Sequence, residues 1–203
     1  IPPTWAPDFN VDALVIAGYV LTELSIGLLI GLVTRFAFDG MLMAASVVSY
    51  QMGFGTSSLF MQDAGAQMDS FTAFHRVLMM LFFFGLNLHF IFLSAITDTF
   101  QMIPGGGANL NAPLGHVLIT ATAGIFVVAV KIAAPIIVAL MFTMAALGLI
   151  ARAVPQMNVF TLSFPASFFI GLAIYIATFP LYPDWMTTHF SEAHDQVRYM
   201  IQG

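Results

Sequence analysis

The chain has 203 residues, of which 60% are hydrophobic and 7% are charged, and its formal net charge is -5. Soluble domains are on average about 45–50% apolar and about 25% charged, so ten acidic and five basic residues cannot cover a soluble body of this size. The acidic balance excludes a nucleic-acid binder with a basic surface, and a sequence without cysteine excludes disulfides and thiolate sites. These proportions predict an all-α, polytopic membrane protein whose apolar surface faces lipid or other apolar subunits.

The first third of the chain is expected to contain apolar helices followed by a loop. The sequence opens Ile1-Pro2-Pro3 without an initiator methionine or a basic stretch, so no signal peptide is visible, and we expect either a processed chain or a fragment that lacks its N-terminus. An apolar stretch runs over 13–38 and a shorter one over 41–52, which predicts apolar helices within 13–52. Residues 53–70 are rich in Gly, Ser, Met, Gln and Asp, a composition typical of a loop.

A third apolar helix is predicted over 71–103, ending at the breaker cluster Pro104-Gly105-Gly106-Gly107. The next apolar stretch, 116–150, would extend roughly 52 Å at about 1.5 Å per residue, whereas the hydrocarbon core of a bilayer is about 30 Å thick. It must therefore tilt, project from the bilayer or kink at Pro135, where the ring removes a backbone hydrogen bond.

The last part of the chain predicts a helical hairpin over 116–182. A short turn at 152–158 separates two apolar stretches, the second of which is 159–182. Residues 183–203 form a polar, amphipathic tail. No stretch alternates between apolar and polar residues with period two, which disfavours an outer-membrane barrel.

Two charged residues lie inside apolar stretches, where a charge is expensive. Glu23 could serve as an ion or proton site, or its carboxyl could face a protein interior. Gly27 and Gly31 share a helical face with Glu23 at four-residue spacing, and small residues at this spacing favour helix packing in lipid. Lys131 could be a counter-ion for Glu23, or it could snorkel toward an interface.

The sequence predicts no catalysis, cofactor or metal site. Histidines occur at five positions without HxxxH or HExxH spacing, and His189 and His194 are expected to be solvated in the tail. There is no GxSxG elbow, and the glycines after Pro104 lack the lysine and preceding strand of a phosphate loop.

The segment after residue 51 combines glycines with flexible or bulky apolar side chains. Hydrophobic constrictions can close a pore by dewetting, and methionine suits a deformable seal. The alternative is an ordinary loop tucked against helices, and the residues alone leave both interpretations open. The candidate gate residues are Met52, Gly53, Phe54, Gly55, Thr56, Leu59, Phe60 and Met61.

Residues Ala146 to Pro165 read Ala-Leu-Gly-Leu-Ile-Ala-Arg-Ala-Val-Pro-Gln-Met-Asn-Val-Phe-Thr-Leu-Ser-Phe-Pro. This long run resembles the signature of the FliR family of flagellar export-gate proteins and of its type III secretion relatives. Glu23 to Gly27 with Gly31 looks like the ExxIGxxxG helix of this family, and Gln51-Met52-Gly53 looks like its QMG motif. Asp98-Thr99-Phe100 followed by Pro104 also fits, so the resemblance extends over nearly the whole chain. Because the family normally has a further apolar helix before the point where this chain starts, the resemblance implies that an N-terminal helix is missing.

The resemblance implies one non-enzymatic export-gate domain over 1–203 that joins several copies of FliP and FliQ, with FlhB associated. The gate would pass unfolded export substrates across the bacterial inner membrane, within the flagellar basal body and projecting toward the periplasm. Residues 53–70 would form a plug loop across the closed pore. The hairpin would be FliQ-like, and its motif turn with Arg152, Pro155 and Gln156 would contact neighbouring subunits.

Three other functions stay open at this point. A virulence-type secretion homologue would carry the same motifs. An ion-coupled secondary transporter would pair Glu23 with Lys131 at the bilayer midplane, although no internal repeat is visible. A scaffold that never lines the pore would differ only in where residues 53–60 lie. The chain also departs from the family at Ala45-Ser46, where members often carry Gly-Glu, and at Asn87-Leu88-His89, where they carry Asn-Gly-His.

Overall fold

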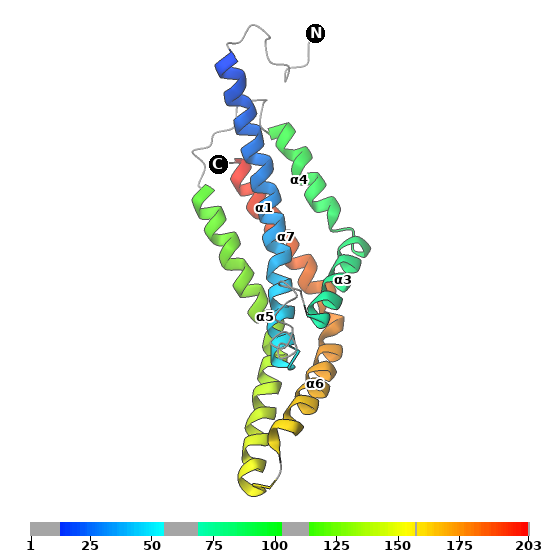
Figure 1. Cartoon of the computed structure of the whole chain (residues 1–203). Helices are drawn as coiled ribbons and strands as arrows, with labels where there is room; N and C mark the ends of the chain where they lie inside the picture. Colours follow the sequence, from blue (N-terminus) through cyan, green and yellow to red (C-terminus); the bar gives the residue numbers. More distant parts are fainter. Residues whose placement is uncertain (1–12, 55–68, 103–113, 157, 203) are drawn as a thin grey trace. The chain divides into compact units, whose positions relative to one another are not determined.

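The computed structural model describes residues 13–54, 69–102, 114–156 and 158–202 (Figure 1). All regular elements within these ranges are helices, and the all-α fold predicted from the composition is confirmed. In chain order they are α1 (Ala13–Gln51), α3 (Ser70–Gly85), α4 (His89–Met102), α5 (Leu114–Ala153), α6 (Val159–Thr178), the short 3-10 helix η1 (Phe179–Leu181) and α7 (Tyr182–Gln202).

Helix α1 is one continuous helix of 39 residues, whereas the sequence suggested that one stretch ends near Asp39 and a second begins at Met41. It contains no proline, and a lone glycine inside a helix costs only about 1 kcal/mol relative to alanine, so Gly40 does not interrupt it. Gly40 instead permits a close approach, because a Cβ at this position would lie 3.2 Å from the Cα of Ile125 in α5.

Three hydroxyl groups in the first two thirds of α1 are satisfied by the backbone of the same helix. Thr22, Ser25 and Thr34 donate to the carbonyl oxygens four residues earlier, at 2.8, 2.7 and 2.8 Å. An unsatisfied polar group in hydrocarbon costs several kcal/mol. These side chains can therefore lie in an apolar environment without a partner from another helix.

The third predicted helix is broken into α3 and α4 at residues 86–88. Asn87 has a φ of 58°, the left-handed conformation that asparagine tolerates better than most residues. The Asn87 N–H donates to the Phe84 carbonyl at 3.1 Å, and the Leu88 N–H donates to the Phe83 carbonyl at 3.0 Å. This is a Schellman motif, which ends α3 and explains why the apolar stretch does not continue as one helix.

Helix α5 runs through Pro135 without interruption and is 40 residues long. Helix α6 follows after a short turn, and the pair is seen as a hairpin in Figure 1. Asn158 caps the N-terminus of α6, where its side chain accepts the Thr161 N–H at 3.3 Å. Capping by asparagine satisfies one of the backbone donors that a helix start leaves free.

The chain divides into two compact units that are interleaved in sequence. The first comprises residues 1–38, 83–124 and 186–203, and the second comprises 39–82 and 125–185.

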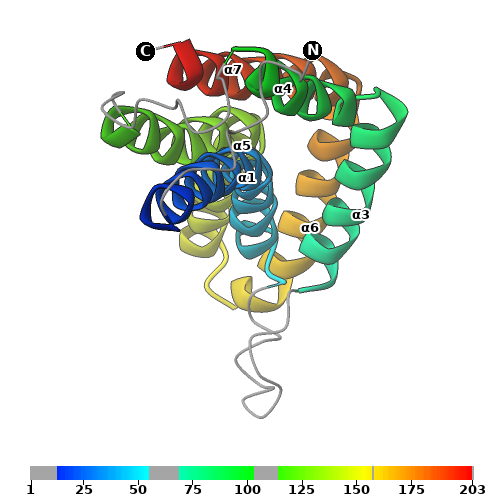
Figure 2. The same cartoon turned by 90° about the horizontal axis from the view of Figure 1, so that it is seen from above.

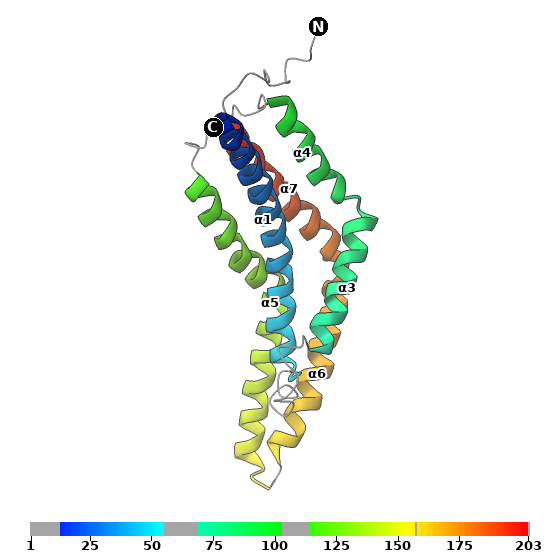
Figure 3. The ribbon, with the colours of Figure 1, turned by 45° about the horizontal axis from the view of Figure 1, so that its top comes forward.

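Phenylalanine side chains form the centre of the first unit. Phe190 of α7 is fully buried, and its ring centroid lies 5.0 to 5.6 Å from those of Phe38, Phe83 and Phe92. Such aromatic pairs contribute about 0.5–1.5 kcal/mol beyond area burial. The contact between Phe38 and Phe190 joins α1 to α7, and both helices can be followed in Figure 3. The predicted amphipathic tail is thus a helix with one buried face.

The second unit packs the C-terminal part of α1 against α3, α5 and α6. Helix α3 lies beside α6 in Figure 2, and the ring centroids of Phe71 and Tyr175 are 5.0 Å apart. Side chains that share one face of α1, at spacings of three and four residues, are at most 2% exposed: Met41, Ala44, Ala45, Val48 and Met52. This spacing is that of a helix face turned toward a core.

Three helical stretches among the described residues are long and apolar enough to cross a membrane, namely Ala13–Gln51, Leu118–Ala153 and Thr161–Arg198. The bent pair Ser70–Gly85 and His89–Gln101 makes a fourth if it is counted as one span. Large apolar side chains are exposed along these stretches, for example Leu24 and Leu28.

Candidate functional site

The end of α1 is built by a second Schellman motif. The Gly53 N–H donates to the Tyr50 carbonyl at 3.1 Å, and the Phe54 N–H donates to the Ser49 carbonyl at 3.1 Å. Gly53 has a φ of 96°, which glycine adopts without a steric penalty. The glycine of the Gln51-Met52-Gly53 sequence is thus explained by the backbone, because it ends the helix and turns the chain.

Two close contacts fix this turn to α6. A Cβ at Gly171 would lie 2.6 Å from the Met52 Cγ, so the Met52 side chain lies directly on the glycine. A Cβ at Gly53 would lie 2.7 Å from the Phe164 Cδ2. Met52 is completely buried. Each contact requires a glycine on one side, so the turn and α6 approach more closely than larger residues would permit.

Phe54, the last residue described before the predicted plug, lies between two aromatic rings. Its centroid is 5.9 Å from that of Phe71 on α3, with the rings stacked, and 5.6 Å from that of Phe168 on α6. The start of the predicted plug is therefore held by α3 and α6 together.

Asp69 lies at the start of α3 and hydrogen-bonds residues of both α1 and α3. Its carboxylate accepts the Thr72 N–H at 2.9 Å and the Thr72 hydroxyl at 2.8 Å, so that it caps the N-terminus of α3. The same carboxylate accepts the hydroxyl of Ser49 in the last turns of α1. Ser49 and Thr72 are each 1% exposed.

The charge of Asp69 is stabilised by these bonds. Partial burial raises the pKa of the carboxyl, but the hydrogen bonds from Ser49 and from Thr72 outweigh burial and hold the pKa below its ordinary value of 3.8. Asp69 is thus an ionised acceptor shared by α1 and α3 at neutral pH.

We call the turn at residues 49–54, together with the side chains that contact it and with Asp69 and Thr72, the anchor. Of the predicted gate residues, Met52, Gly53 and Phe54 lie in the anchor. The remaining five, Gly55, Thr56, Leu59, Phe60 and Met61, lie outside the residues that the structure describes.

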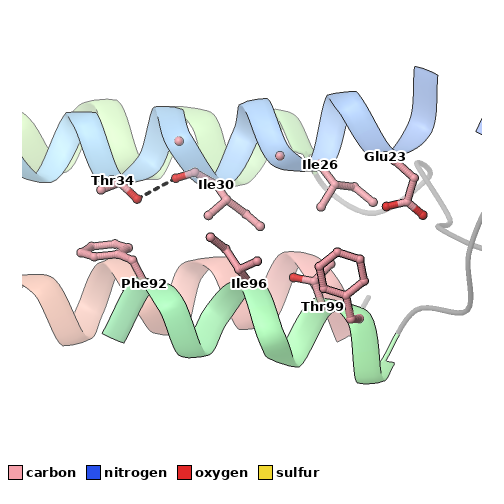
Figure 4. A pocket seen from close by; sticks show the side chains of 10 residues that line it. Glu23, Ile26, Ile30, Thr34, Phe92, Ile96 and Thr99 are labelled. Carbon is pink, nitrogen blue, oxygen red and sulfur yellow. Dashed lines mark hydrogen bonds between the residues drawn. The ribbon is translucent and has the colours of Figure 1, made fainter. Parts of the chain in front are cut away.

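Glu23, Gly27 and Gly31 line an open groove in the first unit. The groove has a volume of about 340 Å³ and lies between α1 and α4. Figure 4 shows Ile26 and Ile30 of α1 opposite Ile96 and Thr99 of α4, with Glu23 at one end of the α1 row. Its lining is mostly apolar, and Glu23 provides a carboxylate at its edge.

The two glycines of the groove have free space above them. A Cβ at Gly27 or at Gly31 would meet no atom within 4 Å. Within the described chain, the predicted helix-packing face of α1 is therefore not filled by a close helix contact. Lys131 lies in the other unit, where it is exposed on α5.

The motif turn between α5 and α6 is exposed. Arg152 lies in the last turn of α5, where a positive charge interacts favourably with the helix dipole. Arg152, Pro155 and Gln156 are all exposed. Their side chains are therefore accessible to a neighbouring molecule.

A buried polar cluster in the second unit was missed by the sequence analysis. His75 of α3 is 1% exposed, and its Nδ1 lies 2.8 Å from the Tyr175 hydroxyl. Tyr175 is in turn hydrogen-bonded to Tyr182. These bonds satisfy Nδ1 of His75, whereas its buried Nε2 has no hydrogen-bond partner among the described residues, an exception to the general rule for buried polar groups.

The expectation that His189 and His194 are solvated is wrong, because both side chains are half-buried. They lie in the part of α7 that belongs to the first unit, where one face of the helix is buried, and the prediction did not take the apolar spacing of that helix into account. Among the described residues, no group of three or more His, Cys, Asp or Glu could hold a metal ion.

The anchor also contains residues that sequence reasoning did not select. An aspartate just before an apolar run, as at Asp69, is a recognised helix-start signal, but the helix was predicted from residue 71 without Asp69 as its cap. Gly171 gave no signal, because its role depends on a contact with a residue 119 positions away in the chain.

Its all-α fold, its membrane-length apolar helices and its exposed apolar side chains place the chain in the class of polytopic helical membrane proteins. Residues 2–193 match the model of a family described as bacterial export proteins, family 1. The chain belongs to this family.

Individual relatives carry a more specific description. Flagellar biosynthetic protein FliR of Escherichia coli (strain K12) is 29% identical over 192 residues, which are 95% of this chain and 72% of that protein. Its namesake in Aquifex aeolicus (strain VF5) is 29% identical over 185 residues, 91% of this chain and 71% of that protein. The Bacillus subtilis (strain 168) protein of the same name is 28% identical over 157 residues, 76% of this chain and 61% of that protein.

Proposed function

We propose that the chain is a pore-forming subunit of a bacterial flagellar protein-export gate, in which residues 53–70 plug the closed pore. The gate passes unfolded proteins across the inner membrane. Membership of an export family supports the transport role. The flagellar names of the relatives favour a flagellar over a virulence-type system.

The observation that carries the plug is its double attachment. Phe54 at one end and Asp69 at the other contact the same helices, α1 and α3. A plug needs such fixed points at both of its ends. Gly53, with its left-handed φ, ends α1 and directs the chain into the proposed plug.

The partners are homologues of FliP and FliQ, with a homologue of FlhB associated. Leu24 and Leu28 are more than 60% exposed on α1, and the nearby groove leaves Gly27 and Gly31 open to a close helix contact. An apolar face with small residues suits packing against the helix of another membrane subunit. The subunit acts without catalysis, so that its partners supply the energy.

The plug is tested by deleting Gly55 to Phe60 in the full-length protein and measuring ion leak across membranes that contain the assembled gate. We expect the deletion to raise small-ion conductance. Deletion of Gly105 to Gly107, which also shortens a glycine-rich segment, serves as the control and should leave conductance low. Equal conductance of the two deletions and the wild-type gate would refute the plug.

The partners are tested separately by native mass spectrometry. The full-length protein is co-expressed with its FliP and FliQ homologues and purified in mild detergent. We expect a hetero-oligomer that contains one copy of this chain. A monomer or homo-oligomer that ignores those subunits would contradict the proposal.

A further inference from the structure

Asp69 joins the two ends of the 55–68 segment. One of its oxygens accepts both the Ser49 hydroxyl and the Thr72 N–H, and the other accepts the Thr72 hydroxyl. Ser49 belongs to α1, before the segment, whereas Thr72 belongs to α3, after it. The Asp69 carboxylate therefore links the helix that precedes residues 55–68 to the helix that follows them.

Ser49 takes part in both halves of the anchor. Its carbonyl accepts the Phe54 N–H and so closes the turn at the end of α1, while its hydroxyl donates to Asp69. Phe54 also stacks on Phe71, which lies between Asp69 and Thr72 in the chain. The polar link and the aromatic contact thus hold the same two stretches together.

We propose that Asp69 is the residue that positions the plug, by latching the last turn of α1 to the first turn of α3 through Ser49. This inference rests on the proposed function of residues 53–70. The latch fixes the described residues on both sides of the proposed plug, so its loss should raise the ion leak less than deletion of the plug does.

Substitutions of the two residues whose hydroxyls donate to the Asp69 carboxylate separate the latch from ordinary helix capping. Ser49→Ala removes the bond between α1 and α3 and leaves the cap on α3 intact. Thr72→Val removes the hydroxyl bond within α3 and retains the bond to Ser49. Both side chains are buried to the same extent, so the pair is matched for burial and differs in whether the lost bond joins the two ends. Asp69→Ala removes both kinds of bond.

These 203 residues contain no cysteine, so Met52→Cys introduces the only cysteine among them and can report on the anchor, with the gate lacking Met52→Cys as the labelling control. Met52 is fully buried, and in the otherwise unchanged full-length gate a water-soluble maleimide should label the reporter slowly. We expect Ser49→Ala and Asp69→Ala to increase both the labelling rate and the ion leak several-fold. Thr72→Val loses one bond to the same carboxylate but keeps the bond between α1 and α3, so its effect on both should be clearly smaller.

The deletion of Gly55 to Phe60 separates failure of the latch from failure of the plug. If that deletion leaks while Ser49→Ala and Asp69→Ala stay tight and slowly labelled, the latch is overturned and the plug stands. If the deletion does not leak, the plug fails, and the labelling rate alone decides whether Asp69 holds the anchor together.

Discussion

The side chain of Met52 lies directly on the backbone of Gly171. A Cβ at Gly171 would come within 2.6 Å of the Met52 Cγ, which is nearer than unbonded carbon atoms can lie. We therefore expect Gly171→Ala to destabilise the protein by about 1–3 kcal/mol, as overpacking of a core commonly does. The melting temperature of the purified protein in detergent measures this effect.

Gly148→Ala is the control for that substitution. Gly148 lies in α5, and a Cβ there would meet no atom within 4 Å, so the change should be neutral or stabilising by up to about 1 kcal/mol. In a Met52→Ala background the cost of Gly171→Ala should disappear, because the clashing group is gone. A cost that persists in this background would show that the contact is not its cause.

Gly53→Ala should destabilise the anchor through two separable effects. The alanine Cβ would lie 2.7 Å from the Phe164 ring, and the φ of 96° is unfavourable for any residue with a Cβ. Phe164→Ala should relieve the steric effect but not the backbone effect, which is about 1–2 kcal/mol. Thermal unfolding of the single and double variants measures both, and full rescue by Phe164→Ala would contradict the backbone contribution.

The contribution of Asp69 to stability should depend on pH. Its pKa in the folded state is lower than its ordinary value of 3.8, so the ionised carboxylate stabilises the fold above the unfolded-state pKa, and this stabilisation is lost as the pH falls through the folded pKa. Asp69→Asn cannot ionise. The difference in melting temperature between wild type and Asp69→Asn should therefore be present near pH 7 and shrink below about pH 4.

Asp195→Asn, at an exposed position on α7, controls for general effects of acid and of a lost charge. A difference between wild type and Asp69→Asn that is constant from neutral to acidic pH would mean that the charge of Asp69 does not contribute.

Filling the groove beside Glu23 should impair assembly more than folding. Gly27→Leu places a side chain in space that is open in this chain, so the melting temperature of the isolated protein should change little. The yield of complex with the FliP and FliQ homologues should fall, because a close helix contact at the glycine would be blocked. Gly18→Leu lies on the same helix at a position that does not line the groove, and its smaller effect on yield would support the groove as the contact.

Arg152→Ala should likewise reduce the yield of assembled gate. Arg152 is exposed at the end of α5, and loss of an exposed side chain should change the stability of the isolated chain by no more than about 0.5 kcal/mol. Arg152→Lys keeps the charge and should recover part of the yield. Normal complex formation by Arg152→Ala would remove the motif turn from the interface.

Composition and apolar spacing were sufficient to predict the fold class, because a chain with so few charged residues has no soluble alternative. They did not predict the break at Asn87. That residue lies within an apolar stretch, and its left-handed φ is favoured by the two hydrogen bonds that close the end of α3. Nor did they predict that α1 continues past Asp39. The charged residue at position 39 suggested the end of an apolar stretch, and the role of Gly40 is to allow the close contact with α5.

The site was predictable only where a motif reflects local backbone geometry. Gly53 could be selected because a glycine after a helix commonly takes the left-handed position. Phe164, which contacts Gly53, and Gly171, which contacts Met52, could not be selected, because each lies more than 100 residues away from its partner in the chain and becomes its neighbour only on folding. Asp69 lies between these cases, since its capping role is local and its bond to Ser49 is not.

The interleaving of the two units has a consequence for biosynthesis. The boundaries at 38/39, 82/83, 124/125 and 185/186 each fall inside a helix, in α1, α3, α5 and α7 respectively. No contiguous fragment therefore contains either unit alone. The ribosome must reach α7 before the last elements of either unit exist, so most of the helices are inserted while their eventual packing partners are still untranslated.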